Sequence, residues 1–401
     1  PPYAAAERGA AGEGTDWLGL ITRNGHIQEH NVNLQGGSQN TQYMVSFNYY
    51  DHKGIIRNSG MKRYTMKTNI DQKFLDIFKA GMNLTLTRID NDNTQLGDGN
   101  FENSGIIRSA IQMGPNIKAY DEETGTYPIN PLLGSQPNPY SLLNNTDKGR
   151  TDRLLGTVFV EARPLEGLVL RVNAGIDHAA INRSTYQPRT TLNGYNLNGV
   201  AYIYNTANNQ YLMEGTATYQ RTFADIHNLN LLAGVSYEKF NYDASELGNN
   251  NFTTDAFLYN NIEAGTGNKI VKSDATENKM LSYFFRAGYV LKGRYLLTAT
   301  LRADGASVFA KNNKWGYFPS VALGWTMSEE EFLKKAEWLS NLKLRLSWGQ
   351  TGNADISTNA FASYGAQGSW INSNYKTVNG VMKSRLENPD LKWETTSEWN
   401  L

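Results

Sequence analysis

Histidine is a common metal-binding side chain, and two of the five histidines in this chain are close in sequence. His26 and His30 are four residues apart, a spacing that on a helix would suit a zinc ion. The pair instead lies in a segment that we expect to be an alternating strand. Four strand residues span roughly 13 Å, which is too far for two ligands of one ion. The chain has no cysteine, so a Cys-based site is also excluded, and we expect no metal site.

Two further segments have the composition of an ion-binding or phosphate-binding loop. The sequence DNDNTQLGDGNF, 90–101, has Gln95 where a calcium-binding EF-hand loop needs glycine and Phe101 where it needs a bidentate glutamate. We therefore interpret it as a solvated loop, with a loosely bound ion as the alternative. The sequence AGTGNK, 264–269, lacks the spacing of a phosphate-binding loop. No G-x-S-x-G or H-E-x-x-H motif is present, so we expect neither an enzyme nor a bound cofactor.

Aromatic side chains are better candidates for ligand contact, because 23 Tyr and 8 Trp are present. Tyrosine and tryptophan rings stack on sugar rings and on peptide side chains. Packing within a loop is the alternative for each single residue. The candidate substrate-binding residues are those in the long connections described below, namely Tyr120, Tyr127, Tyr140, Tyr364, Trp370 and Tyr375.

The elements that must position these residues are β-strands, because apolar and polar residues alternate along most of the chain. In one example, Leu342, Leu344 and Leu346 alternate with Lys343 and Arg345. The alternation predicts about 13 strands, with ends uncertain by about two to four residues. The predicted strands are 26–37, 41–53, 61–73, 76–90, 151–163, 167–181, 209–223, 226–243, 276–292, 293–307, 315–328, 340–352 and 391–401.

The connections between these strands alternate between short and long. Short connections are expected at 38–40, 74–75, 164–166, 224–225, 292–293 and 328–339, and longer ones at 54–60, 91–150, 182–208, 244–275, 308–314 and 353–390. This asymmetry, with many strands longer than ten residues, is typical of a transmembrane β-barrel. A soluble sandwich or propeller has no reason to sort its connections in this way.

The two faces of the predicted strands differ in chemistry. Tyr283, Phe285 and Tyr289 share one face, which in a membrane barrel would contact lipid. The opposite face carries charged residues that fit a polar lumen, although alternation alone does not exclude an outward face open to water. These are Arg286, Arg302, Asp304, Arg345, Glu394 and Glu398.

The remaining sequence signals concern helices, charge and the N-terminus. We expect a helix from Ser104, ending at Gly114-Pro115, and another from Ser328, where Glu331 completes a capping box. Pro319 predicts a bulge or a missing hydrogen bond. The 38 basic and 38 acidic residues balance, which argues against a nucleic-acid partner. The first residues, PPYAAAERGAAGEG, do not resemble a signal peptide, and no run of about 18 apolar residues predicts a membrane helix.

Four segments of the sequence carry distinctive combinations of aromatic, glycine and charged residues. The first, 14–56, contains Asp16-Trp17, Gly36-Gly37, Tyr43, Tyr49 and Gly54. The second, LTATLRADGASVFAKNNKWGYFPSVALGW, has Arg302, Asp304, Gly305, Ser307, Phe309, Trp315, Gly316, Phe318, Pro319 and Ser320. The third and fourth are LKLRLSWGQTGN, 342–353, and NPDLKWE, 388–394. In this order the segments resemble the SusC/RagA family of TonB-linked outer-membrane transporters. The resemblance covers nearly the whole chain and is weakest in the long connections.

This resemblance implies a barrel of about 22 strands with a plugged lumen in the bacterial outer membrane. It implies a TonB-energised importer of oligosaccharides or peptides, with a SusD-like lipoprotein as a lid. No segment resembles the plug or the TonB box. We therefore interpret 1–25 as an outer segment leading into the barrel, and 26–401 as a partial, open all-β barrel with free edges at 26–37 and 391–401. The alternative is a surface-exposed glycan-binding, peptide-binding or adhesion protein without transport.

Overall fold

The computed structural model describes residues 14–94, 105–134, 136–334, 336, 338–355, 360–371 and 377–401, without the side chains of 363–382. Its main element is a sheet of thirteen antiparallel strands whose neighbours follow chain order. These are β1 (His26–Gly37), β2 (Thr41–Lys53), β3 (Gly60–Phe74), β4 (Phe78–Asp92), β5 (Thr146–Leu165), β6 (Leu168–Gln187), β7 (Val200–Phe223), β8 (His227–Asn250), β9 (Ile270–Leu291), β10 (Tyr295–Ala306), β11 (Trp315–Thr326), β12 (Lys343–Asn353) and β15 (Glu394–Asn400).

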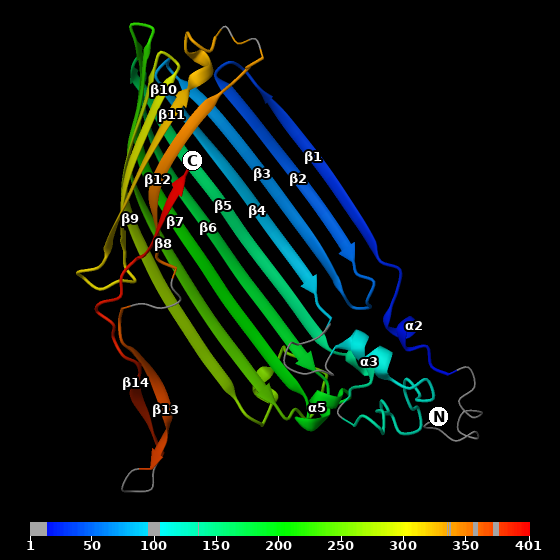
Figure 1. Ribbon diagram of the computed structural model, residues 1–401. Helices are drawn as coiled ribbons and strands as arrows, with labels where there is room; N and C mark the ends of the chain where they lie inside the picture. The colour runs from blue at the N-terminus through cyan, green and yellow to red at the C-terminus, as the bar shows by residue number, and fades with distance from the viewer. Residues whose placement is uncertain are drawn as a thin grey trace.

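The sheet is strongly curved and open, as the sequence predicted. Figure 1 shows β10–β12 bending forward from the plane of β1–β6. Within the described sheet β1 and β15 are the two edges, and they do not pair with each other. A separate hairpin of β13 (Ser363–Ile371) and β14 (Thr377–Arg385), which alternation did not predict, projects from the connection between β12 and β15.

The long connections gather at one end of the sheet, together with the short helices (Figure 1). Those helices are α2 (Trp17–Ile21), α3 (Ile106–Gln112), α4 (Pro139–Leu142), α5 (Leu192–Asn196) and the 3-10 turn η1 (Ile262–Ala264). The strands at this end are longer than predicted. For example, β7 begins at Val200 and β8 continues to Asn250. The paired strands therefore extend into what the sequence predicted to be loop.

The register separates two faces, which we call convex and concave. Cross-strand partners share a face, so Phe47 lies beside Met66, and Met66 beside Leu86. The convex face exposes one such apolar side chain on almost every strand. They include Val32, Phe47, Met66, Leu86, Val158, Val172, Met213, Val235, Phe285, Leu301, Val321 and Leu346.

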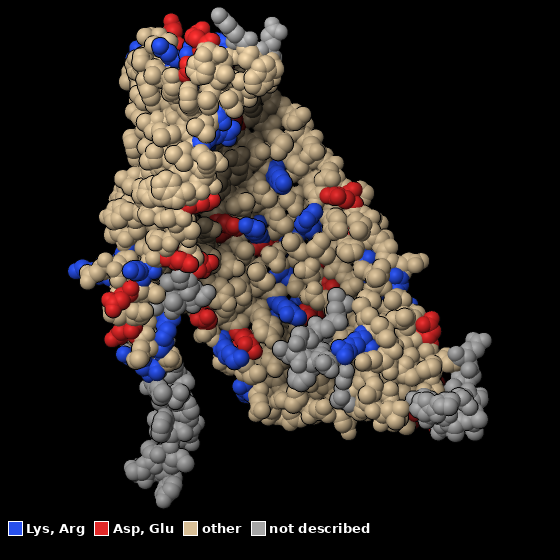
Figure 2. Space-filling view, viewed as in Figure 1, with Lys and Arg blue, Asp and Glu red and all other residues tan. Residues whose placement is uncertain are grey.

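The exposed apolar band identifies the surface that contacts lipid. Met213 is 61% exposed and Tyr317 64% exposed, and a water-facing sheet would leave this area unfavourably solvated. The concave face is polar instead, and Figure 2 shows Lys, Arg, Asp and Glu side chains scattered across it. The predicted lumen residues all lie on this concave face: Arg286, Arg302, Asp304, Arg345, Glu394 and Glu398.

Among the described residues, the buried apolar clusters lie at the end of the sheet with the long connections. One cluster joins α2 to α3 and α4 through Trp17, Ile21 and Ile106. A second centres on Phe309, Phe318 and Trp393, and a third on Tyr186, Ala201 and Phe252. No helix among the described residues is both long enough and apolar enough to cross a membrane.

The predicted helix from Ser328 is wrong. Residues Met327–Glu329 form a 3-10 turn, η2, and the described residues after it form turns. Phe332 is 69% and Trp338 84% exposed, so the segment has no packed apolar face, and a short helix without tertiary packing is marginal in water. The helix predicted from Ser104 is observed as α3, which begins at Ile106.

Glu330, rather than a helix, holds this connection against the sheet. Its carboxylate accepts hydrogen bonds from the Trp325 indole (2.9 Å), the Tyr295 hydroxyl (2.6 Å) and the Arg294 guanidinium (2.9 Å). These three donors hold the pKa of Glu330 below its usual value, with the Tyr295 hydrogen bond as the largest cause.

No bulge is present at Pro319. Leu301 pairs with Pro319 in an unbroken β10–β11 register, and the β11–β12 ladder stops one residue away, at Ser320. The missing N–H of proline is thus tolerated where pairing to β12 has ended.

Candidate functional site

Three of the predicted substrate-binding tyrosines lie together in the connection between β4 and β5. The ring centroids of Tyr120 and Tyr127 are 5.0 Å apart, and those of Tyr127 and Tyr140 are 6.1 Å apart. Tyr120 is 41% exposed and Tyr140 36% exposed, so this tyrosine cluster is open to solvent. The rings are tilted by 58° and 56°, which presents ring edges and faces rather than one flat surface.

A small hairpin places the first two of these rings side by side. Asp121 and Thr126 form an isolated antiparallel bridge, and Tyr120 and Tyr127 are the residues just outside it. Gly125 has φ +66°, a left-handed conformation that favours glycine. The Asp121 carboxylate accepts the Glu123 backbone N–H at 3.0 Å, and this bond is the main cause of its lowered pKa.

Asn138 joins all three tyrosine-bearing segments. Its side-chain amide donates to the carbonyl oxygens of Ala119 (3.2 Å) and Pro128 (2.9 Å), beside Tyr120 and Tyr127. Its side-chain oxygen accepts the backbone N–H of Tyr140 at 2.9 Å and so caps α4. The side chain is 1% exposed, and its loss would leave buried backbone groups without partners.

Asn138 was not predicted from the sequence, because the candidates were chosen as aromatic side chains and not as residues that position those side chains. The available signal was Asn138-Pro139, since Asn is a preferred N-cap and Pro a preferred first residue of a helix. A second missed contact is Asn144, whose amide donates to the Tyr127 hydroxyl at 2.7 Å.

No contact in the described part of the chain connects the other three predicted binding residues to this cluster. Tyr364 and Trp370 lie in β13, but their side chains fall outside the described part of the chain. Tyr375 lies outside the described residues altogether, as do 95–101 of the calcium-loop-like segment. Among the described residues, no group of three or more His, Asp or Glu side chains is arranged to hold a metal ion.

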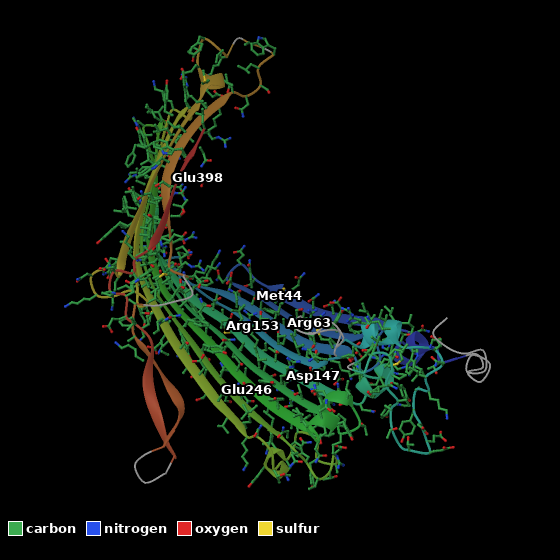
Figure 3. All side chains as sticks on the ribbon, turned by 60° about the horizontal axis from the view of Figure 1, so that its bottom comes forward. Met44, Arg63, Asp147, Arg153, Glu246 and Glu398 are labelled. Carbon is green, nitrogen blue, oxygen red and sulfur yellow. The ribbon has the colours of Figure 1, made fainter. Side chains whose placement is uncertain are left out.

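The concave face adds a second polar surface beside the connections. Figure 3 shows Met44, Arg63, Asp147, Arg153, Glu246 and Glu398 along the inside of the curve. Arg153 donates to Asp177 (Nε–Oδ1 2.8 Å), and Arg183 donates to Asp147 (Nε–Oδ1 2.9 Å). Such paired charges of both signs suit a wetted passage for polar molecules better than a dry core.

Towards the short-turn end, the concave face is tightly packed around one aromatic ring. Phe159 is buried, with the Arg171 guanidinium 3.9 Å and the Lys79 ammonium 5.5 Å from its ring centroid. Lys79 also pairs with Asp71 at 2.9 Å. A Cβ added to Gly81 would lie 2.4 Å from Phe159, so only glycine lets the ring lie against β4.

Comparison with known families decides the assignment of this two-faced sheet. Residues 121–401 match the family model described as "TonB dependent receptor-like, beta-barrel". The chain belongs to this family. Its receptor barrel therefore lies in the bacterial outer membrane, with the apolar convex face towards lipid and the polar concave face towards the lumen.

Named relatives extend the match to most of the residues before 121 in this chain. The chain is 32% identical over 391 residues to TonB-dependent receptor P3 of Formosa agariphila, covering 96% of this chain and 39% of the relative. It is 30% identical over 421 residues to TonB-dependent receptor SusC of Bacteroides thetaiotaomicron, covering 96% and 40%. The chain thus spans about two fifths of the length of these relatives.

Solved structures show the same fold. The RagAB peptide importer in its "closed-closed" state matches with a TM-score of 0.80 at 24% identity, over 96% of this chain and 43% of that one. The RagAB peptide transporter structure matches with a TM-score of 0.80 at 23% identity.

Two of the four segments that carry the family resemblance pack against each other in the receptor barrel. Trp393, from NPDLKWE, lies 5.3 Å from Phe309 and 5.3 Å from Phe318 between ring centroids. Asn313 donates to the carbonyl oxygen of Pro389 at 3.0 Å. These residues therefore build the hairpin between β10 and β11, and nothing in their packing requires a ligand.

Proposed function

We propose that the chain is the barrel part of a TonB-dependent outer-membrane importer that takes up oligosaccharides or peptides. The observation that carries this proposal is the family match over 121–401, on a sheet whose concave face is polar and whose convex face is apolar. An importer needs a passage for polar cargo through an apolar membrane, and this division of faces supplies its wall.

The names of relatives and fold neighbours, together with ring chemistry, support this cargo class. One relative is named SusC, and one fold neighbour is a peptide importer. We infer a SusD-like lipoprotein above the long connections and TonB on the periplasmic side as partners. Both oligosaccharides and peptides offer flat apolar surfaces for aromatic rings, with hydroxyl or amide groups beside them.

Within this proposal, the tyrosine cluster of Tyr120, Tyr127 and Tyr140 contacts the cargo on the outer side. Its rings are solvent-exposed and mutually packed, so binding costs little side-chain entropy. Asn138 is a positioning residue, because it fixes the backbone beside each ring.

Growth of a host strain tests the function. The gene for the full-length receptor is deleted, and growth is measured on a panel of single oligosaccharides and peptides as carbon or nitrogen source. We expect loss of growth on one class, restored by the wild-type gene. Unchanged growth and uptake on every oligosaccharide and peptide would contradict the importer.

The tyrosine cluster is tested in the same strain. Complementation with Tyr120→Ala/Tyr127→Ala/Tyr140→Ala should lower uptake of the identified cargo about 10-fold or more, since each stacked ring contributes on the order of 1 kcal/mol. The matched control is Tyr195→Ala, a 75% exposed tyrosine in α5 that makes no ring contact with the described aromatic residues. Equal uptake by the triple variant and this control would remove the cluster from the cargo path.

A further inference from the structure

The convex face changes abruptly from apolar to charged towards the end with the long connections. On β4, Leu86 is followed on the same face by Arg88 and then Asp90. On β5, Leu154 lies opposite Leu86, and Asp152 lies opposite Arg88. This boundary marks the level at which the hydrocarbon region ends and lipid headgroups begin.

Two clefts meet at this boundary on the convex face. The cleft nearer the apolar band, called the lower cleft, is about 830 Å³. Its apolar lining is Phe47, Met66, Leu86 and Leu154, and its charged lining includes Arg88, Asp90, Asp152 and Arg153. The upper cleft, about 750 Å³, is lined mainly by polar and charged side chains. Asp90 lines both clefts, so the two clefts adjoin at this residue, and together we call them the groove.

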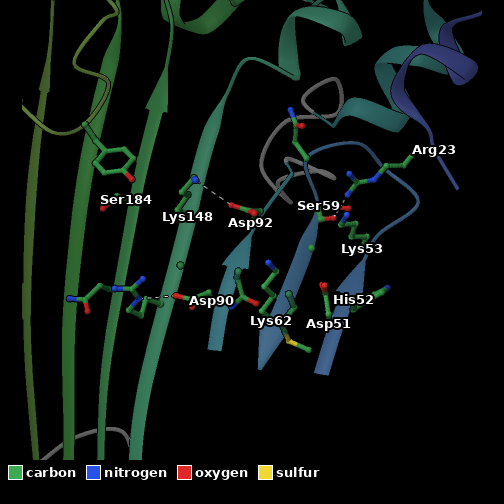
Figure 4. A pocket seen from close by; sticks show the side chains of 18 residues that line it. Arg23, Asp51, His52, Lys53, Ser59, Lys62, Asp90, Asp92, Lys148 and Ser184 are labelled. Atoms are coloured by element: carbon green, nitrogen blue, oxygen red, sulfur yellow. Dashed lines mark hydrogen bonds and ion pairs between the residues drawn. The ribbon is translucent and has the colours of Figure 1, made fainter. Parts of the chain in front are cut away.

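The upper cleft has an excess of positive charge. Five Lys or Arg side chains and three Asp side chains line it. Arg150 pairs with Asp90 at 2.8 Å, and Lys148 approaches Asp92 at 3.8 Å, as the dashed lines in Figure 4 show. The remaining charged side chains of the upper cleft are one carboxylate, Asp51, and three cations, Arg23, Lys53 and Lys62.

Those further cations are available to an anion. Lys53 and Lys62 form no ion pair with any described residue, and both are exposed. Lys62 lies between Asp51 and Asp90 in the cross-strand register and in Figure 4. The Arg23 guanidinium donates to the neutral carbonyl oxygens of Gly54 (3.0 Å) and Ser59 (2.7 Å), so its charge is not neutralised.

We propose that this groove binds one anionic lipid of the outer leaflet. Its phosphate lies at Lys53 and Lys62, and an acyl chain covers Phe47, Met66 and Leu86. An amphiphile is required because a polar ion would leave the apolar cleft bare, whereas a neutral lipid would leave the excess charge of the upper cleft uncompensated. The inference rests on the membrane location of the sheet, not on the proposed cargo.

Lipid retention by the purified full-length receptor tests the proposal. Native mass spectrometry from detergent micelles containing phosphatidylglycerol or phosphatidylcholine gives the lipid bound per receptor and, by titration, its apparent Kd. We expect tighter binding of phosphatidylglycerol. Lys53→Gln/Lys62→Gln should weaken it roughly 10- to 30-fold, because each cation near an anionic lipid contributes a factor of about five. Phosphatidylcholine binding should change little.

The matched control is Lys67→Gln. Lys67 is an exposed lysine on the same strand, β3, but on the concave face, and it forms no ion pair with a described residue. An equal loss with this control would overturn the proposal, and so would displacement of the lipid by inorganic phosphate alone. A change of oligomeric state in Lys53→Gln/Lys62→Gln with lipid retention unchanged would assign the groove to a protein interface instead.

Discussion

The indole N–H of Trp393 donates a hydrogen bond to the carbonyl oxygen of Lys314 at 3.0 Å, although the residues are 79 positions apart. The bond fastens the segment before β15 to the tip between β10 and β11. Phe309 is fully buried beneath this contact. The segment around Phe309 and the segment around Trp393, which are separate motifs in the sequence, therefore pack as one unit.

Replacing Trp393 should loosen this unit. Trp393→Phe removes the hydrogen bond and should cost about 1–3 kcal/mol, while Trp393→Ala also leaves a cavity and should cost about 3–5 kcal/mol. Limited proteolysis of the full-length receptor at 307–314 measures the opening. The control is Trp399→Phe on the convex face of β15, away from the contact with Lys314, which should cleave like wild type. Cleavage of both Trp393 variants at the wild-type rate would refute the packing role.

Asn138 should prove necessary for cargo binding without touching the cargo. Asn138→Asp keeps an acceptor for Tyr140 but turns an oxygen towards the carbonyl oxygens of Ala119 and Pro128, so the tyrosine cluster should spread. We expect cargo affinity to fall about 5- to 30-fold, as loss of a buried hydrogen-bond partner costs about 1–2 kcal/mol. Isothermal titration with the identified cargo measures it. Asn198→Asp, at an exposed loop position, is the control, and equal affinity in both variants would contradict the role.

The hairpin of Asp121 should weaken in acid. Backbone N–H groups lower the pKa of its carboxyl in the folded state, so its stabilising effect is fully present above the unfolded pKa of about 3.9 and is lost as pH falls through the lower folded pKa. Cargo affinity should therefore decline below that range. In Asp121→Asn this part of the pH dependence should disappear. A decline of equal size in the variant would assign it to another group.

Glu330 should make the connection between β11 and β12 sensitive to acid in the same direction. Its folded pKa is lowered, so protonation weakens its bonds to Tyr295, Trp325 and Arg294 only as pH falls through that lowered value. Proteolysis of 331–342 by an acid-active protease should accelerate there. Glu330→Gln should be cleaved faster even at neutral pH, whereas Glu331→Gln, 80% exposed, should match wild type. Indistinguishable cleavage of the two variants would sink this prediction.

Gly81 should not tolerate a side chain. A Cβ there would lie 2.4 Å from Phe159 and from the Asp71 carboxylate, so Gly81→Ala must displace the ring or β4, at about 1–3 kcal/mol. Gly156→Ala is the control, because its nearest neighbours are at an ordinary 3.5 Å. The fraction of folded receptor in a thermal unfolding series measures the difference. Equal midpoints for the two variants would contradict the close contact.

Much of the sheet was predictable because strand alternation is a local property. The side chain of each successive strand residue points to the opposite face, so Phe285 and Arg286 are placed on opposite faces without tertiary information. The predicted helix from Ser328 failed because its capping box is only a local preference, while Glu331 is exposed and Glu330 is held by Trp325 and by two sequence-distant donors, Arg294 and Tyr295.

The sequence alone determined the thirteen strands of the main sheet, their chain order, their alternation between two faces and the family resemblance. Only the tertiary structure decided that Tyr120, Tyr127 and Tyr140 form one cluster, and that Asn138 holds it. It also decided that Trp393 closes the hairpin at Lys314 and that lysines from β2 and β3 meet above an apolar cleft. The reason is physical: alternation is set by the pleat of each strand, whereas these contacts depend on how distant segments fold back on one another.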